Sequence, residues 1–135
     1  MADLRGALPS DAADLALLFG TTPRVMALRL EALARDPSGT VLVALGGSGA
    51  VVGVVALHWA PSLQTDRAVA KISALVVAED ERRQGIGRAL IKAAAQSARV
   101  AGCDTMEIVA TGAFFDALGF VATGPSLSRR LRKQA

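Results

Sequence analysis

One stretch of this chain combines an apolar strand, a charged loop, two spaced glycines and the start of a helix. It runs from Leu75 to Leu90 and reads LVVAEDERRQGIGRAL. The first turn of a helix has free N–H groups and positive partial charge, and glycines let a phosphate approach the backbone closely. Arg82, Arg83 and Arg88 add formal charge at the same point. The stretch therefore predicts an anion-binding turn, most simply for a pyrophosphate.

Three known pyrophosphate-binding turns can be compared with this stretch. A P-loop ends in Gly-Lys-Ser/Thr, whereas Gly87 is followed by arginine and alanine, so this class is excluded. A dinucleotide-binding fingerprint requires a third glycine where the chain has Leu90, and Asp104 is only loosely placed for its acidic residue. The third class, Arg-x-x-Gly-x-Gly, fits Arg82, Gly85 and Gly87 and binds the pyrophosphate of coenzyme A.

The residue inventory limits the remaining chemistry. The 135 residues include one cysteine, Cys103, and one histidine, His58, and no tyrosine. An internal disulfide, a cysteine-built zinc site and any site with two imidazoles are excluded, and we expect no metal. A serine hydrolase triad is not excluded by these counts, because it needs a single histidine.

Charge is distributed unevenly along the chain. Residues 1–81 hold six Lys/Arg and nine Asp/Glu, while residues 82–135 hold nine and three. A basic second half suits an anionic partner, either a phosphorylated cofactor or a nucleic acid. Four basic residues of the tail lie without interleaved aromatic residues, which argues against nucleic acid; they are Arg129, Arg130, Arg132 and Lys133.

The elements that must position these residues follow from local signals. Ser10 and Thr22 are expected to cap two helices, one ending at Gly20 and one at Asp36-Pro37, the second with an apolar stripe of Val25, Leu28, Leu30 and Leu33. We expect strands at 3–8, 40–45, 50–59 and 68–77. After them we expect a helix at 86–101 ending at Gly102, a strand at 105–110, a helix at 113–118 and a last strand at 126–132. This order predicts a single mixed α/β domain over residues 1–135.

The apolar run from Val41 to Ala60 is about as long as a membrane span. Gly46-Gly47-Ser48-Gly49 divides it, and both flanks are rich in valine, which favours a buried β-hairpin. The first residues lack the basic and apolar segments of a secretory signal. We therefore expect no membrane partner and a cytoplasmic location.

Arg82-x-x-Gly85-x-Gly87, preceded by Leu75-Val76-Val77, resembles the acetyl-coenzyme A motif of the GNAT superfamily of N-acetyltransferases. Residues 113–120 (AFFDALGF) resemble the late helix of that family, and residues 51–55 (VVGVV) resemble its third strand. The resemblance covers nearly the whole chain. It implies a GNAT-like mixed, splayed β-sheet flanked by helices.

The resemblance also implies an activity and a set of site residues. Acetyl-coenzyme A would be the cosubstrate, and the acetyl group would pass directly to a primary amine of a small molecule or peptide. The backbone of Leu75, Val76 and Val77 would pair with the pantetheine arm, and Phe115 would lie near the thioester. The pyrophosphate would be held by the turn residues Arg82, Arg83, Gln84, Gly85, Ile86, Gly87 and Arg88.

Two positions depart from the family pattern. Phe115 stands where relatives often have a tyrosine that protonates the leaving thiolate, and Ser73 stands where many have a glutamate base. A thiol pKa near 8.5 makes the acid dispensable, since general acid catalysis is typically worth about 10²–10⁴-fold. A lysine-like amine is charged at pH 7, whereas an α-amine of pKa about 7.7–8.0 is readily neutralised. The acceptor is therefore expected to be a low-pKa amine, or another group accepts the proton.

His58 is the candidate base, because the ordinary pKa of an imidazole suits pH 7. It and Ser73 are the candidate acceptor-binding residues. The alternative function is a coenzyme A-binding module with weak or no catalysis, in keeping with the missing tyrosine and glutamate. The sequence leaves a homodimer open.

Overall fold

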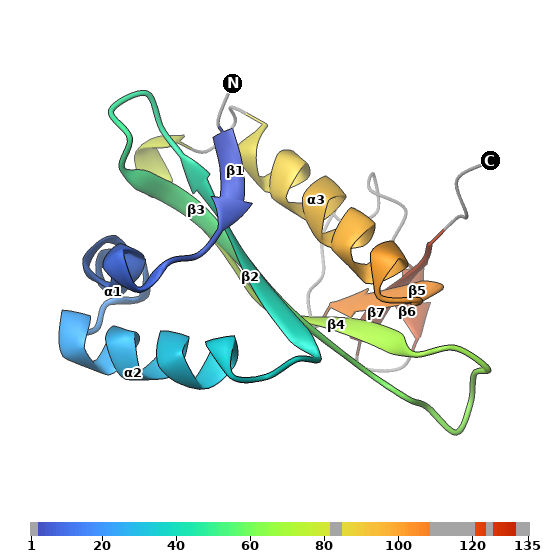
Figure 1. Cartoon of the computed structure of the whole chain (residues 1–135). Coiled ribbons are helices and arrows are strands. Elements are labelled where there is room, and N and C mark those ends of the chain that lie inside the picture. Colours follow the sequence, from blue (N-terminus) through green and yellow to red (C-terminus); the bar gives the residue numbers. More distant parts are fainter. Residues whose placement is uncertain (1–2, 82–84, 109–120, 124–125, 132–135) are drawn as a thin grey trace.

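The computed structural model describes residues 3–81, 85–108, 121–123 and 126–131. These residues form one mixed sheet with helices on both faces (Figure 1). The strands are β1 Asp3–Gly6, β2 Gly39–Leu45, β3 Val51–Ala60, β4 Val69–Val77, β5 Thr105–Ile108, β6 Val121–Thr123 and β7 Ser126–Arg130. The helices are α1 Ala12–Phe19, α2 Pro23–Ala34 and α3 Ile86–Val100, with short 3-10 turns at Pro9–Asp11 and Glu79–Glu81.

The sheet order is β1-β2-β3-β4-β5-β7-β6, and every pairing is antiparallel except that of β4 with β5. In this parallel pair, Val69 to Ile72 align with Thr105 to Ile108, where the described part of β5 ends. Beyond Ile72, β4 continues to Val77, and its neighbour there among the described strands is β3. The sheet is therefore splayed at the carboxyl end of β4, which confirms the expected mixed, splayed architecture.

The helices divide the core between the two faces of the sheet. Helices α1 and α2 pack on one face, against buried residues such as Val43 and Val54. Helix α3 packs on the other face, where Leu90, Ile91 and Ala94 bury against Val55 and Leu57. Figure 1 shows α1 and α2 on one side of β2 and β3, with α3 on the opposite side. A β3 buried almost throughout explains why the run from Val41 to Ala60 is so apolar.

Most expected elements form with small changes of boundary. Thr22 caps α2 by accepting a hydrogen bond from the Val25 N–H at 3.2 Å, and Gly20 ends α1 with a positive φ of 67°. The expected hairpin joins β2 to β3 through residues 46–50. No helix in the described ranges is long and apolar enough to cross a membrane.

Two local predictions are wrong. Ser10 does not cap α1, because residues 9–11 form a 3-10 turn and Asp11 precedes the helix. The predicted apolar stripe of α2 is wrong in part: Leu30 is buried as expected, but Met26 is buried instead of Val25 and Leu28, which are 38% and 60% exposed. A stripe of Met26, Leu30 and Leu33 fits helical periodicity equally well, and only packing on the sheet selects it. Strand β6 was not expected, and the expected helix at 113–118 lies outside the described residues.

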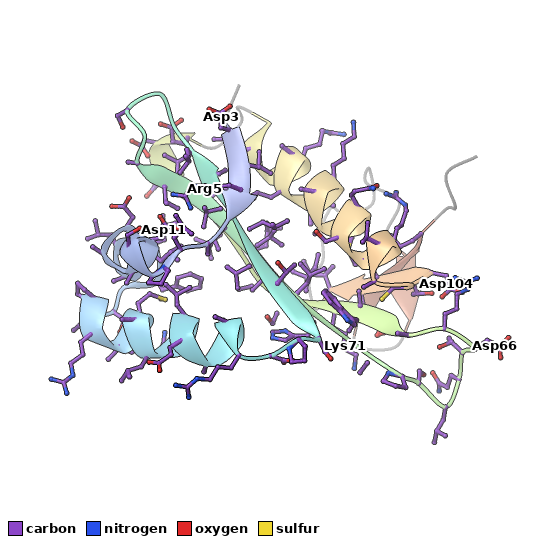
Figure 2. The ribbon with its side chains drawn as sticks, in the orientation of Figure 1. Asp3, Arg5, Asp11, Asp66, Lys71 and Asp104 are labelled. Carbon is purple, nitrogen blue, oxygen red and sulfur yellow. The ribbon has the colours of Figure 1, made fainter. Side chains whose placement is uncertain are left out.

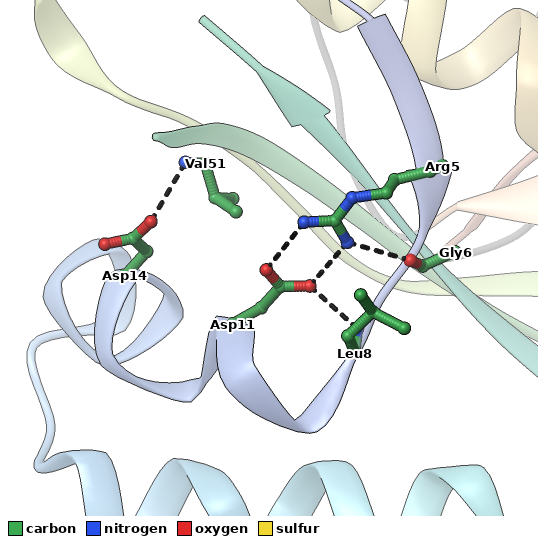
Figure 3. A network of polar contacts seen from close by, with 6 residues as sticks. All are labelled: Arg5, Gly6, Leu8, Asp11, Asp14 and Val51. Atoms are coloured by element: carbon green, nitrogen blue, oxygen red, sulfur yellow. Dashed lines mark hydrogen bonds and ion pairs between the residues drawn. The ribbon is translucent and has the colours of Figure 1, made fainter. Parts of the chain in front are cut away.

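The turn before α1 is held by an ion pair (Figure 3). Asp11, 5% exposed, accepts hydrogen bonds from both terminal nitrogens of Arg5, at 2.8 and 2.9 Å, and from the Leu8 N–H at 2.7 Å. Hydrogen bonding to Arg5, opposed by burial and aided by the Leu8 N–H, lowers the pKa of Asp11 below its ordinary value. The network ties β1 to α1.

Asp11→Asn is expected to lower the free energy of unfolding by about 1–2 kcal/mol, since the charged contacts to Arg5 become neutral ones. The lowered pKa means that the native state stabilises the charged form of Asp11 more than the unfolded chain does. Its contribution is therefore full above about pH 4 and is lost as the pH falls through the native pKa. Urea unfolding at pH 7 and at pH 3 tests this; a variant with an equal deficit at both pH values would contradict it.

Candidate active site

The splayed end of β4 presents backbone groups that the described strands do not use. Leu75 and Val76 pair with Val55 and Val54 on the β3 side, and no described strand lies on their other side. In a ladder, the N–H and C=O groups of every second residue point away from the paired neighbour. This part of β4 can therefore accept an extended, amide-containing partner in the manner of an added strand.

A β-bulge marks the point where the splay begins. Ala56 aligns with Ala74 and Leu57 with Ile72, so Ser73 is the extra residue of β4. Its hydroxyl donates a long hydrogen bond of 3.4 Å to the Ala56 carbonyl oxygen. Bulges bend a strand and redirect its side chains, and they are common beside active sites. Ser73, a predicted acceptor-binding residue, thus lies at the apex of the splay and is exposed.

Helix α3 begins close to this end of β4. Gly85 precedes it with φ 78°, a left-handed conformation that suits glycine, and its carbonyl accepts the Ala89 N–H at 3.0 Å. The backbone N–H groups of Ile86, Gly87 and Arg88 fall in the first helical turn, where helices have no internal acceptors. The Arg88 side chain is exposed there. Free N–H groups and positive partial charge suit an anion, so anion binding at this turn stays a prediction.

The position of α3 depends on a close approach to β3 at Gly53. A Cβ atom on Gly53 would lie 3.0 Å from Ile86 Cγ2, 3.0 Å from Leu90 Cδ1 and 3.5 Å from the Val76 carbonyl oxygen. Ile86 and Leu90 are both buried. Because Gly53 has no side chain, the first turns of α3 pack directly against the sheet, near the carboxyl end of β4.

His58 lies further down the sheet than this edge. It aligns with Gly39 on β2 and with Lys71 on β4, and it is half-buried. Its ring lies against Gly39, where a Cβ atom would come within 2.7 Å of His58 Cδ2. The sheet also brings Glu107 of β5 into register with Lys71. The sequence analysis did not identify Lys71 and Glu107. The available signal was that each of them alternates with apolar residues along its strand.

Comparison with known proteins gives this geometry a family. The sequence model of the acetyltransferase (GNAT) family matches residues 12–120. The chain belongs to the GNAT family. No curated protein sequence matches it significantly.

Solved structures of GNAT proteins share the fold at low sequence identity. An acetyltransferase from Trypanosoma brucei is 24% identical, with all of both chains covered and a TM-score of 0.78. A GNAT family N-acetyltransferase (YhbS) from Escherichia coli, in complex with CoA, is 23% identical over 97% of this chain and 82% of its own, with a TM-score of 0.75. A phosphinothricin acetyltransferase from Sinorhizobium meliloti, in complex with AcCoA, is 22% identical over 96% and 88%, with a TM-score of 0.80.

Several predicted GNAT site residues lie outside the described residues: Arg82, Arg83, Gln84 and Phe115. The described part of the site thus consists of the β4 edge, the turn at Gly85 and the start of α3. No cluster of three or more His, Cys, Asp or Glu side chains in that part could hold a metal ion. Burial raises the pKa of the Cys103 thiol, with a further contribution from Asp104, which does not favour a thiolate nucleophile.

Proposed function

We propose that this GNAT protein is an acetyl-coenzyme A-dependent N-acetyltransferase that acts on a primary amine of a small molecule or peptide. The observation that carries the proposal is the edge of β4 at Leu75, which no described strand covers, beside the start of α3. A long cosubstrate with amide groups at one end and phosphates at the other matches this combination. The described residues of this site therefore fit acetyl-coenzyme A.

Each part of the site has a separate task in this proposal. The outward backbone groups of Leu75 would orient the pantetheine amides, since Val76 directs its own groups toward β3, and the N–H groups of Ile86, Gly87 and Arg88 would hold the pyrophosphate. Acetyl-coenzyme A supplies an activated acetyl group: the acceptor nitrogen bonds to its carbonyl carbon, the carbon–sulfur bond breaks, and the amine's proton balances the one taken up by the thiol. Ser73 and His58 remain the predicted acceptor-side residues.

Release of free thiol from acetyl-coenzyme A in the presence of a panel of amines tests this function. Acetylation of at least one amine, verified by the mass of the product, is the expected result. Binding of acetyl-coenzyme A with no turnover on any amine would favour the alternative, a coenzyme A-binding module. This alternative matters because Ser73 stands where many relatives have a glutamate base.

A low-pKa amine is expected to be the better acceptor, by about tenfold or more at pH 7. An α-amine with a pKa near 8 is partly neutral there, whereas neutralising a lysine-like amine of pKa about 10.4 costs roughly 4–5 kcal/mol. Initial rates on an α-amine and a side-chain amine of similar size measure the preference. Equal or reversed rates would mean that a protein group accepts the proton, and His58→Gln should then slow the side-chain amine selectively.

A further inference from the structure

A cationic and an anionic residue lie in register on neighbouring strands, on the sheet surface that α3 does not cover. Met106 and Ile108 of β5, and Ile72 of β4, are buried in the core cluster that contains α3. Because side chains alternate along a strand, Glu107 and Lys71 lie on the opposite face. They align across the parallel pair, so their strands lie about 4.8 Å apart at this point. Figure 2 shows Lys71 at the lower end of the sheet.

The two side chains line a small cavity with the β3–β4 loop. Its volume is about 330 Å³, at the low end for ligand sites. Thr105, Ser62, Gln64 and Thr65 also line it. Hydrogen bonds within the loop hold its shape: the Gln64 N–H donates to Ser62 Oγ at 3.1 Å, and Thr65 Oγ1 donates to the Arg67 carbonyl at 2.6 Å. The cavity therefore combines polar and apolar walls, is partly preformed and has room for a small molecule.

Lys71 and Glu107 are not paired with each other. Among the described residues the ion pairs are Arg5–Asp11 and Glu31–Arg35, and neither Lys71 nor Glu107 has a side-chain hydrogen bond there. Lys71 is exposed and Glu107 half-buried. A simple amine would be attracted by Glu107 but repelled by Lys71. A molecule that carries an ammonium and a carboxylate satisfies both charges at once.

The cavity adjoins the apex of the splay. Lys71 is two residues before Ser73 on the same strand, about 7 Å along it. We propose that this cavity binds the acceptor as a zwitterion, an α-amino acid in the simplest case, with Lys71 holding the carboxylate and Glu107 orienting the amino group. The inference rests on the proposed function for the reaction, but the binding preference is a property of the cavity itself.

Calorimetry on the full chain, with and without coenzyme A, tests the preference without requiring turnover. The probes are the L-amino acids, each compared with its decarboxylated amine and its amide. At least one amino acid should bind about 10- to 100-fold more tightly than either analogue, as expected for loss of one charged hydrogen bond. Lys71→Met should remove that difference, because it weakens binding of the amino acid and relieves the repulsion of the amine, and Glu107→Gln should weaken both the amino acid and the amine.

Lys92→Met is the matched control, because it makes the same change at an exposed position on α3, and it should leave binding unchanged. If no amino acid binds more tightly than its decarboxylated amine, or if Lys71→Met leaves the preference intact, the inference is wrong. Amino acid binding without thiol release would contradict the proposed function and keep the zwitterion site. Equal thiol release with amines that have a carboxylate and amines that lack one would support the proposed function and contradict the zwitterion site.

Discussion

Glutamate in place of Gly87 is expected to abolish detectable acetyl-coenzyme A binding while the fold is kept. Gly87 is the second residue of α3, in the turn whose free N–H groups would hold the pyrophosphate. Two unit charges of like sign about 4 Å apart repel by about 4 kcal/mol at an effective dielectric constant of about 20, which is roughly a 10³-fold loss of affinity. The added side chain also occupies the space that a phosphate needs.

The same substitution should not destabilise the protein. Glutamate has a higher helix propensity than glycine by up to about 1 kcal/mol and is favourable near a helix N-terminus. Loss of binding with unchanged or increased thermal stability is therefore the expected signature. Val100→Glu places the same charge at the exposed far end of α3 and should bind acetyl-coenzyme A normally. Wild-type affinity in Gly87→Glu would overturn the site assignment.

Valine in place of Gly53 is expected to reduce both stability and cosubstrate binding. Its side chain would collide with Ile86 and Leu90, which are buried and cannot move aside cheaply. Overpacking of a core typically costs about 1–3 kcal/mol, and we expect a value near the top of this range. Because the collision lies under the first turns of α3, any relaxation should displace the pyrophosphate-binding turn.

Gly6→Val is the matched control for this prediction. Gly6 is also a strand glycine, but a Cβ atom there would meet nothing within 4 Å. Valine suits a strand, so this variant should unfold within about 0.5 kcal/mol of the wild type. Chemical denaturation and calorimetric binding of acetyl-coenzyme A distinguish the two variants. A Gly53→Val protein with full stability and affinity would show that α3 does not depend on this contact.

Local signals in the sequence were sufficient wherever a single residue type controls the backbone. Gly20, Gly85 and Gly102 have positive φ angles at the ends of helices, where glycine is the least strained residue. Thr22 and Pro23 start α2 as expected. The glycine-divided apolar run forms the hairpin of β2 and β3. These features need no information from distant parts of the chain.

Contacts between different elements could not be predicted from sequence patterns. Nothing in the local sequence indicates that Arg5 pairs with Asp11, since a charged strand residue has many potential partners. The phase of the α2 stripe was wrong because valines and leucines occur on both of its sides, and the sheet determines which side is buried. The bulge at Ser73 appears only when β4 is aligned with β3.

The sequence by itself determined the family resemblance, the anion-binding turn and the expected cosubstrate, because these depend on glycines, arginines and a strand that are consecutive in the chain. Only the tertiary structure decided which residues lie together at the proposed acceptor cavity. Lys71 and Glu107 are 36 positions apart, and they lie in register because β4 and β5 pair in parallel there. The register of two strands is set by the packing of their buried faces on α3, and that packing is a property of the whole fold.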